Sequence, residues 1–133
     1  VSYRLVDSEH YQHQHILVVG GGNSALEAAC SLAGQPGNRV CLSYRGQAFH
    51  RPTADNVEQL NQLVDAQQVE LLLESTVTEI GTDRVWILHR DEIKVLPNDF
   101  VFVFAGGVLP TEFLRQTGLE IQRHFGKRIE VVE

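Results

Sequence analysis

Apolar residues along this chain fall into short runs separated by polar and glycine-rich stretches. These runs contain few of the alternating polar residues that mark a strand with one face in water. Strands of this kind are buried on both faces, as in a parallel sheet covered by further layers. Four such strands are predicted: HILVV at 15–19, RVCLSY at 39–44, VELLLES at 69–75 and FVFVF at 100–104.

Two segments between these runs are predicted to be helical. Residues 24–33 are rich in alanine and leucine and contain no proline or glycine, which favours a helix. Within residues 53–66, apolar residues recur at the spacing of one helix face, namely Val57, Leu60, Leu63 and Val64. The first strand, first helix and second strand together span about thirty residues, the length of a βαβ unit.

The pattern changes after the third strand. The short segments VTEI, RVWILHR and IKVL are joined by GTD and DE, which is typical of an antiparallel meander. A last short helix is expected at 111–118, closed by Gly118. We therefore predict an α/β fold with a three-layer, Rossmann-like parallel sheet, in which an antiparallel three-stranded meander forms one crossover.

Composition narrows the class of protein. The 133 residues are 43% hydrophobic and predict one globular domain. The net charge of −6 disfavours binding to nucleic acid or an anionic membrane. The sequence shows no signal peptide and no apolar run long enough to span a bilayer, so the cytoplasm is the expected location.

Neither the cysteines nor the histidines form a metal-binding pattern. Cys30 and Cys41 form neither a C-x-x-C pair nor a zinc pattern, and we expect both to be buried free thiols. His10, His13 and His15 have no carboxylate or cysteine at a suitable spacing. No metal site and no catalytic residue is predicted.

Three consecutive glycines stand where the first strand passes into the first helix. GGGNSA fits the pattern G-x-G-x-x-A, with Gly20, Gly22 and Ala25 at its key positions. The first glycine allows a tight turn, the second lets a pyrophosphate approach the backbone, and the small third residue lets helix and strand pack closely. The helix N-terminus attracts phosphates. The sequence therefore predicts a dinucleotide site; the alternative is a plain tight turn.

The end of the second strand bears on which dinucleotide binds. A site that prefers NAD carries an acidic residue about twenty positions beyond the turn, where it binds the ribose 2′-hydroxyl. Here the second strand ends in Ser43, Tyr44 and Arg45, and no acidic residue occurs before Asp55. Because arginine pairs with phosphate in a bidentate manner, Arg45 and Arg51 favour the 2′-phosphate of NADPH, with NADH as the alternative cofactor.

With both motifs in view, the chain resembles the NADPH-binding domain of the thioredoxin-reductase-like flavoproteins, which are FAD-dependent members of the pyridine nucleotide-disulphide oxidoreductases. The stretches that carry the resemblance are ILVVGGGNSALEAACSL, VCLSYRGQAFHR and NDFVFVFAGG. Many members read G-G-G-[DN]-S-A-x-E, followed by a strand ending in H-R-R-x-x-F-R or a Y-R variant. Tyr44 and Gly46 depart from that pattern, where His and a second Arg are common, which implies a weaker grip on the 2′-phosphate.

The resemblance also implies which residues bind the cofactor. The turn from Gly20 to Ala25 would hold the pyrophosphate, and Glu27 would lie near the nicotinamide end. Tyr44, Arg45 and Arg51 would meet the adenosine ribose and its 2′-phosphate, and Gly106 would line the nicotinamide side. The complete implied set is Gly20, Gly21, Gly22, Asn23, Ser24, Ala25, Glu27, Tyr44, Arg45, Arg51 and Gly106.

The resemblance further implies a part of an enzyme. Residues 1–133 would form a single NAD(P)-binding domain that presents nicotinamide to the FAD of a larger two-dinucleotide-fold flavoprotein. We expect a fragment that is inactive alone, because the chain has no FAD glycine motif and no redox C-x-x-C. Residues from about 1–12 and 106–133 would lead to the FAD-binding domain, the expected partner, in a parent that is expected to be a homodimer. The alternatives are a non-catalytic nucleotide-sensing regulatory domain and a methyltransferase that uses S-adenosylmethionine. A methyltransferase of that kind would need an acidic residue at the end of the second strand, and this chain has none there.

Overall fold

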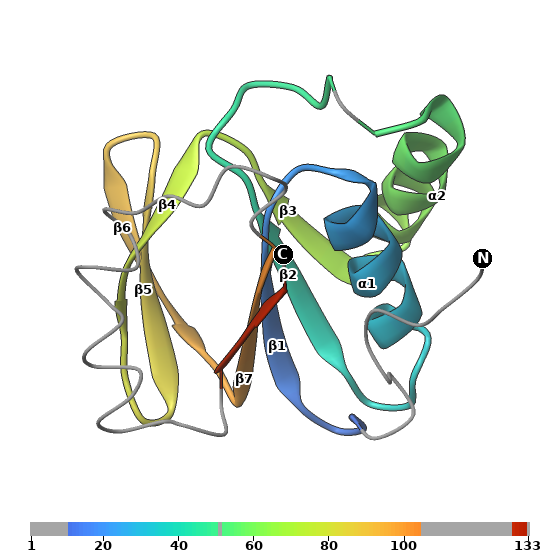
Figure 1. The fold of residues 1–133 in the computed structure, drawn as a ribbon. Coiled ribbons are helices and arrows are strands. Elements are labelled where there is room, and N and C mark those ends of the chain that lie inside the picture. The colour runs from blue at the N-terminus through green and yellow to red at the C-terminus, as the bar shows by residue number, and fades with distance from the viewer. Residues whose placement is uncertain (1–10, 51, 105–128, 133) are drawn as a thin grey trace.

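The computed structural model describes residues 11–50, 52–104 and 129–132, the last as backbone (Figure 1). The helix expected at 111–118 lies outside the described residues. The elements in chain order are β1 (His15–Val19), α1 (Asn23–Ala33), β2 (Arg39–Ser43), α2 (Ala54–Asp65), β3 (Val69–Leu72), β4 (Ser75–Ile80), β5 (Arg84–His89), β6 (Glu92–Pro97), β7 (Phe100–Phe104) and β8 (Ile129–Val132). Among the described residues, no helix is long and apolar enough to cross a membrane.

The main sheet has the predicted Rossmann-like order. Its strands run β3-β2-β1-β7-β8, and every neighbouring pair is parallel. The three central residues of β1 are fully buried, as the apolar run predicted. The antiparallel sheet β4-β5-β6 lies in the connection from β3 to β7, so the predicted meander crossover is confirmed.

The two faces of the main sheet have separate cores. Helices α1 and α2 pack on one face, and the meander covers the other, giving three layers (Figure 1). The helix-side core contains Leu26, Leu60 and Phe102, whereas the meander-side core contains Leu17, Ile87 and Val101. Alternate residues of each central strand therefore serve opposite cores, and their combined burial holds the sheet in place.

Several element ends are shifted by one or two residues, and two connections differ from the prediction. The run VELLLES is one strand in the prediction, but β3 ends at Leu72 and β4 begins at Ser75. The break lies at Glu74, whose φ of 53° is incompatible with a continuing strand. The DE hairpin is also displaced by one residue, because the two turn residues with positive φ are Arg90 and Asp91, and Glu92 already belongs to β6.

Candidate functional site

The glycine turn lies at the carboxyl edge of the main sheet. Strand β1 is flanked by β2 on one side and by β7 on the other, so the chain order reverses between β1 and β7. Open α/β sheets bind ligands in the crevice at such a switch point. Gly20 directly follows β1, and Phe104 ends the neighbouring β7. The motif therefore lies where this fold class binds nucleotides.

Gly20 is required by its backbone. Its φ of 149° is in a region that residues with a side chain rarely adopt. A Cβ at this position would lie 3.1 Å from the Cβ of Ala25 and 3.1 Å from both the Cβ and the carbonyl oxygen of Phe104. Its N–H donates to the carbonyl of Ser43 at 3.0 Å, which continues the pairing of β1 with β2 into the turn. The first glycine thus brings helix and strand together.

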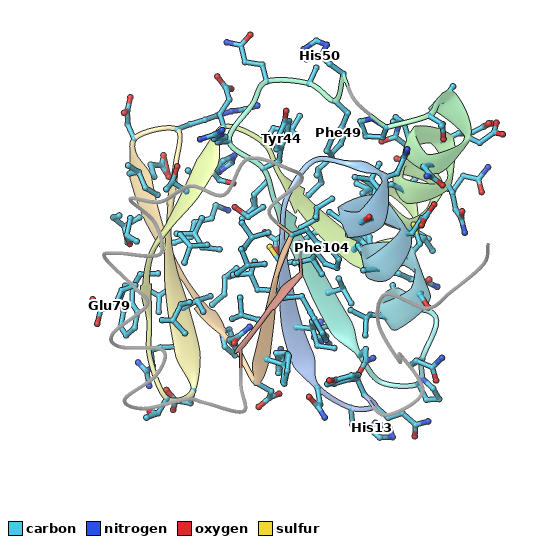
Figure 2. All side chains as sticks on the ribbon, viewed as in Figure 1. His13, Tyr44, Phe49, His50, Glu79 and Phe104 are labelled. Carbon is cyan, nitrogen blue, oxygen red and sulfur yellow. The ribbon has the colours of Figure 1, made fainter. Side chains whose placement is uncertain are left out.

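Gly21 is covered by an aromatic side chain. A Cβ at Gly21 would overlap the ring of Tyr44, the residue that follows β2. That ring stacks on Phe49, with the ring centroids 5.3 Å apart and the planes at 13° (Figure 2). Tyr44 is half-buried between the glycine turn and Phe49, and its backbone N–H donates to Leu72 at 3.0 Å. The sequence places Tyr44 at the site but gives no sign of this contact.

Gly22 is open. A Cβ there would meet no atom within 4 Å, in contrast to its two neighbours. Gly22 is the N-cap of α1 and lacks a side chain that could cap the helix, and the first turn of α1 contains no acidic residue. The N–H groups of this turn can therefore receive an anion, supported by the helix dipole.

Asn23 connects the glycine motif to the second helix. Its Oδ1 accepts hydrogen bonds from the backbone N–H of Thr53 at 2.8 Å and from Nδ2 of Asn56 at 2.9 Å. Nδ2 of Asn56 also donates to Oε2 of Glu27 at 3.2 Å. Thr53 in turn caps α2, because its Oγ1 accepts from the N–H of Asn56 at 3.3 Å. The first turns of α1 and α2 are thus joined by side-chain hydrogen bonds.

The connection from β2 to α2, residues 44–53, carries exposed basic side chains. Arg45 and His50 are both exposed. The connection is also held near its start, where the N–H of Glu74 donates to the carbonyl of Gly46 at 2.9 Å. The Glu74 carboxylate pairs with Arg90 at 2.8 Å and accepts from Gln47 at 3.4 Å. An acid close to the connection is therefore already neutralised.

The structure gathers most of the predicted site residues and extends the set. The motif from Gly20 to Ala25 and the pair Tyr44 and Arg45 lie at one edge of the sheet. Arg51 and Gly106 lie outside the described residues. Sequence reasoning missed Phe49, Thr53 and Asn56. Phe49 could have been found from the sequence, since it is an apolar residue in a polar loop. The role of Asn56 could not, because it depends on the packing of two helices.

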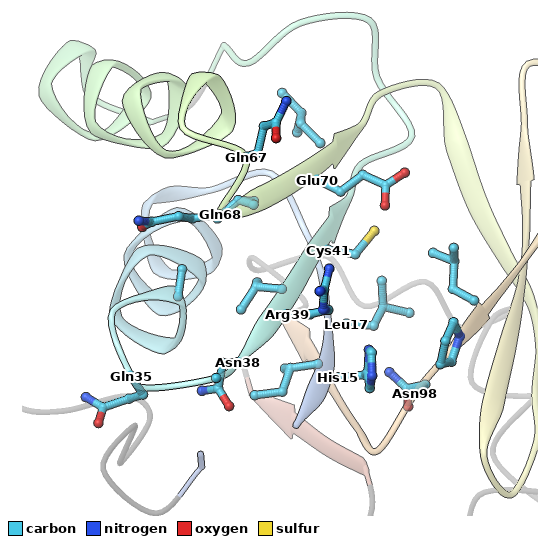
Figure 3. A pocket seen from close by; sticks show the side chains of 18 of the residues that line it. His15, Leu17, Gln35, Asn38, Arg39, Cys41, Gln67, Gln68, Glu70 and Asn98 are labelled. Carbon is cyan, nitrogen blue, oxygen red and sulfur yellow. The ribbon is translucent and has the colours of Figure 1, made fainter. Parts of the chain in front are cut away.

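A hollow lies at the opposite, amino edge of the sheet. It has a volume of about 1130 Å³ and is lined in part by His15, Arg39, Glu70 and Asn98 (Figure 3). The strands begin there, whereas Rossmann-type sheets bind nucleotides where their strands end. This hollow is therefore not the nucleotide site, despite its size.

The two cysteines are free thiols with suppressed acidity. Cys41 is buried in β2, and burial, followed by the nearby charge of Glu70, raises its pKa to about 12. Cys30 is half-buried on α1, and burial and Glu27 raise its pKa as well. Both thiols are thus poor nucleophiles at neutral pH. Within the described part of the chain, no three His, Cys, Asp or Glu side chains are grouped so that they could hold a metal ion.

Comparison with known proteins gives consistent matches. Residues 1–130 match the family described as pyridine nucleotide-disulphide oxidoreductase. The chain is 31% identical over 133 residues to ferredoxin–NADP reductase 2 of Christiangramia forsetii, covering 93% of this chain and 36% of the relative. It is 28% identical over 129 residues to the bacilliredoxin reductase Bdr of Bacillus subtilis, covering 96% of this chain and 40% of the relative. The chain thus spans less than half the length of these relatives.

Comparison with solved structures gives matches of the same kind. The bacillithiol disulfide reductase Bdr of Staphylococcus aureus superimposes with a TM-score of 0.72 at 29% identity, over 82% of this chain and 34% of that one. The thioredoxin reductase of Lactococcus lactis, at 21% identity, shares the fold with a TM-score of 0.63, over 95% of this chain and 46% of that one.

Proposed function

Because the chain belongs to the pyridine nucleotide-disulphide oxidoreductase family, we propose that it is the NADPH-binding domain of a larger FAD-dependent oxidoreductase. The domain would present the nicotinamide so that its hydride can pass to the flavin, which another domain of the parent protein would hold. The chain's own residues would bind and orient the nucleotide. The relatives named for NADP support this choice of cofactor.

The observation that carries the proposal is the contrast between Gly22 and its neighbours. Gly20 and Gly21 are closed by packing, whereas Gly22 leaves open space at the N-terminus of α1. A glycine that is not required for packing, at the point where an anion meets the helix dipole, is what pyrophosphate binding needs. Asn23 and Ser24 would contribute their backbone N–H groups there, and Ala25 keeps the helix close to β7. Glu27 would lie toward the nicotinamide end.

The preference for NADPH is argued from charge. Arg45 is an exposed cation just beyond the end of β2, where an NAD-specific site has a carboxylate. The acid beside this connection, Glu74, is paired with Arg90 and does not repel a second anion there. Arg45 would therefore receive the 2′-phosphate, and Tyr44 would contact the ribose. Arg51 and Gly106 would complete the site.

The test is a calorimetric titration of the chain with NADPH and, separately, with NADH. Arg45→Ala should weaken NADPH binding about tenfold to a hundredfold, since a hydrogen bond to a charged group contributes about 1.5–3 kcal/mol, and should leave NADH binding unchanged. The matched control is Arg39→Ala, because Arg39 is an exposed arginine at the other end of the same strand. Equal binding of both nucleotides would reject the 2′-phosphate assignment. Binding of neither would reject the proposed function of this chain.

A further inference from the structure

We propose that Asn23 and Asn56 are positioning residues that set the preference of this site for NADPH over NADH. Neither is assigned a contact with the 2′-phosphate. They would act by fixing Thr53, and with it the end of the β2–α2 connection that carries His50, next to the glycine turn. The inference rests on the proposed function and concerns the origin of its specificity.

The hydrogen bonds converge on one atom. Oδ1 of Asn23 receives both the Thr53 N–H, at 2.8 Å, and Nδ2 of Asn56, at 2.9 Å. The second proton of Asn56 Nδ2 is directed to Glu27 at 3.2 Å, so both protons of that amide are used within this cluster. The side chain of Asn23 therefore points to α2 rather than capping its own helix.

The connection 44–53 is consequently attached to the glycine motif at both ends. At its start, the Tyr44 ring lies against Gly21 and stacks on Phe49. At its end, Thr53 donates to Asn23, three residues after Gly20. Arg45 stands between Tyr44 and Gly46, which are held by Leu72 and Glu74, whereas His50 is exposed and precedes Thr53 by only three residues. If the Asn23 attachment is lost, one end of the connection is released, and binding must then restrict it again at an entropic cost.

This cost differs between the two nucleotides. Both contain the pyrophosphate, which the backbone of the glycine turn would bind without using residues 45–53. The 2′-phosphate exists in NADPH alone, and His50, at the end of the connection that Asn23 holds, would take part in binding it beside Arg45. Loss of the attachment should therefore weaken NADPH binding more than NADH binding, so the ratio of the two affinities is the quantity to measure.

The variants distinguish a loss of positioning from a general destabilisation of the fold. Asn23→Ala removes the acceptor, whereas Asn23→Asp keeps an oxygen that accepts the same two hydrogen bonds. The negative charge added by Asn23→Asp repels the pyrophosphate that both nucleotides share, and measurement at two salt concentrations corrects the ratio for its additional repulsion of the 2′-phosphate. Asn56→Ala removes the amide that donates to Asn23 and Glu27 and adds no charge. Asn61→Ala, an exposed asparagine on the same helix, is the matched control.

Two readouts are compared for the 133-residue chain: the ratio of NADPH to NADH affinity, and the hydrogen exchange of the Thr53 amide without nucleotide. Asn23→Ala and Asn56→Ala should lower the ratio about fivefold to tenfold, as expected for the loss of one or two hydrogen bonds. Asn23→Ala should also speed Thr53 exchange, while Asn23→Asp and Asn61→Ala should preserve both values.

An unchanged ratio in Asn23→Ala, or equal weakening of both nucleotides, would overturn the inference. So would failure of Asn23→Asp to restore the ratio. If the unmodified chain binds neither nucleotide, the proposed function fails and the inference falls with it. In that case, the Thr53 exchange still reports whether Asn23 holds the connection, so the two failures are distinguishable.

Discussion

The ring of Tyr44 lies against the backbone of Gly21 so closely that no side chain fits between them. The two residues are separated by more than twenty positions, and the parallel pairing of β1 with β2 brings them together. Gly22, the next residue, has no atom within 4 Å of where its Cβ would be. Adjacent glycines in one motif therefore have different roles, one in packing and one in leaving space for a ligand.

Gly21→Ala is expected to destabilise the chain, whereas Gly22→Ala should not. The added methyl at residue 21 must displace Tyr44 from Phe49, at a cost of about 1–3 kcal/mol. At residue 22 the free energy of unfolding should change by less than about 1 kcal/mol, because the space is open and the φ of −98° suits alanine. Urea unfolding measures both.

Nucleotide titration should reveal an effect of Gly22→Ala that unfolding does not. Gly22→Ala fills the space through which the pyrophosphate would approach, so it should weaken NADPH and NADH binding together. A folded Gly22→Ala variant that binds as tightly as the original chain would contradict this.

The double variant Gly21→Ala, Tyr44→Ala removes the ring that the added methyl would displace. It should lower the free energy of unfolding by less than the sum of the two single changes, since they share one contact.

The helix-side core should depend strongly on Phe102. Its ring is 1% exposed and packs edge-on against Tyr11, with centroids 5.3 Å apart. Phe102→Ala should lower the free energy of unfolding by about 3–5 kcal/mol through lost burial and the resulting cavity. Ile93→Ala is the control, because Ile93 is 56% exposed on the meander and should cost less than about 1 kcal/mol. Similar losses for the two variants would contradict the core assignment.

The N-terminus of α2 should depend on the Thr53 hydroxyl. Thr53→Ala removes the oxygen that accepts from the Asn56 N–H and should cost about 1 kcal/mol, whereas Thr53→Ser retains it. The backbone N–H of Thr53, which donates to Asn23, is present in both variants. Thermal unfolding of the pair therefore measures the cap separately from the attachment to α1, and equal melting temperatures would show that the cap is not used.

The central fold could be predicted from the sequence because the patterns that specify it lie within short stretches of the chain. The apolar run 15–19 and the glycines after it specify a buried strand and a turn within a few residues, and the meander has its own alternation. The end of β3 was not predictable, because Leu73 is as apolar as Leu71 and Leu72 before it and the break depends on the φ of Glu74. Residue type alone does not encode that angle.

The side-chain contacts of the site needed the tertiary structure. Asn23 can cap a helix, bind a ligand or contact another element, and the choice depends on where α2 packs. The stack of Tyr44 on Phe49 likewise depends on the path of the connection after β2. Sequence reasoning therefore named the residues of the motif but not the neighbours that hold them.

The stability of the chain should fall in alkaline solution because of Cys41. Burial, followed by the charge of Glu70, raises the pKa of this thiol from 9.0 to about 12, and Lys94 opposes the shift. Below pH 9 the thiol is protonated in both the folded and the unfolded chain, so its contribution to stability is fully present. Between pH 9 and 12 the unfolded chain releases this proton first, so the contribution is lost progressively, by up to about 1.4 kcal/mol per pH unit.

Cys41→Ala isolates this effect, since lysine and tyrosine titrate in both proteins and cancel in the comparison. The variant should lose less stability than the original chain as the pH rises through that range, as measured by urea unfolding. Cys30→Ala is the control: Cys30 is half-buried, so its removal should change the alkaline slope less. Alkylation by iodoacetamide should follow the same order, with Cys30 modified in the folded protein and Cys41 protected until the chain unfolds. An alkaline slope that is the same with and without Cys41 would show that its thiol ionises as readily in the folded protein as in the unfolded chain.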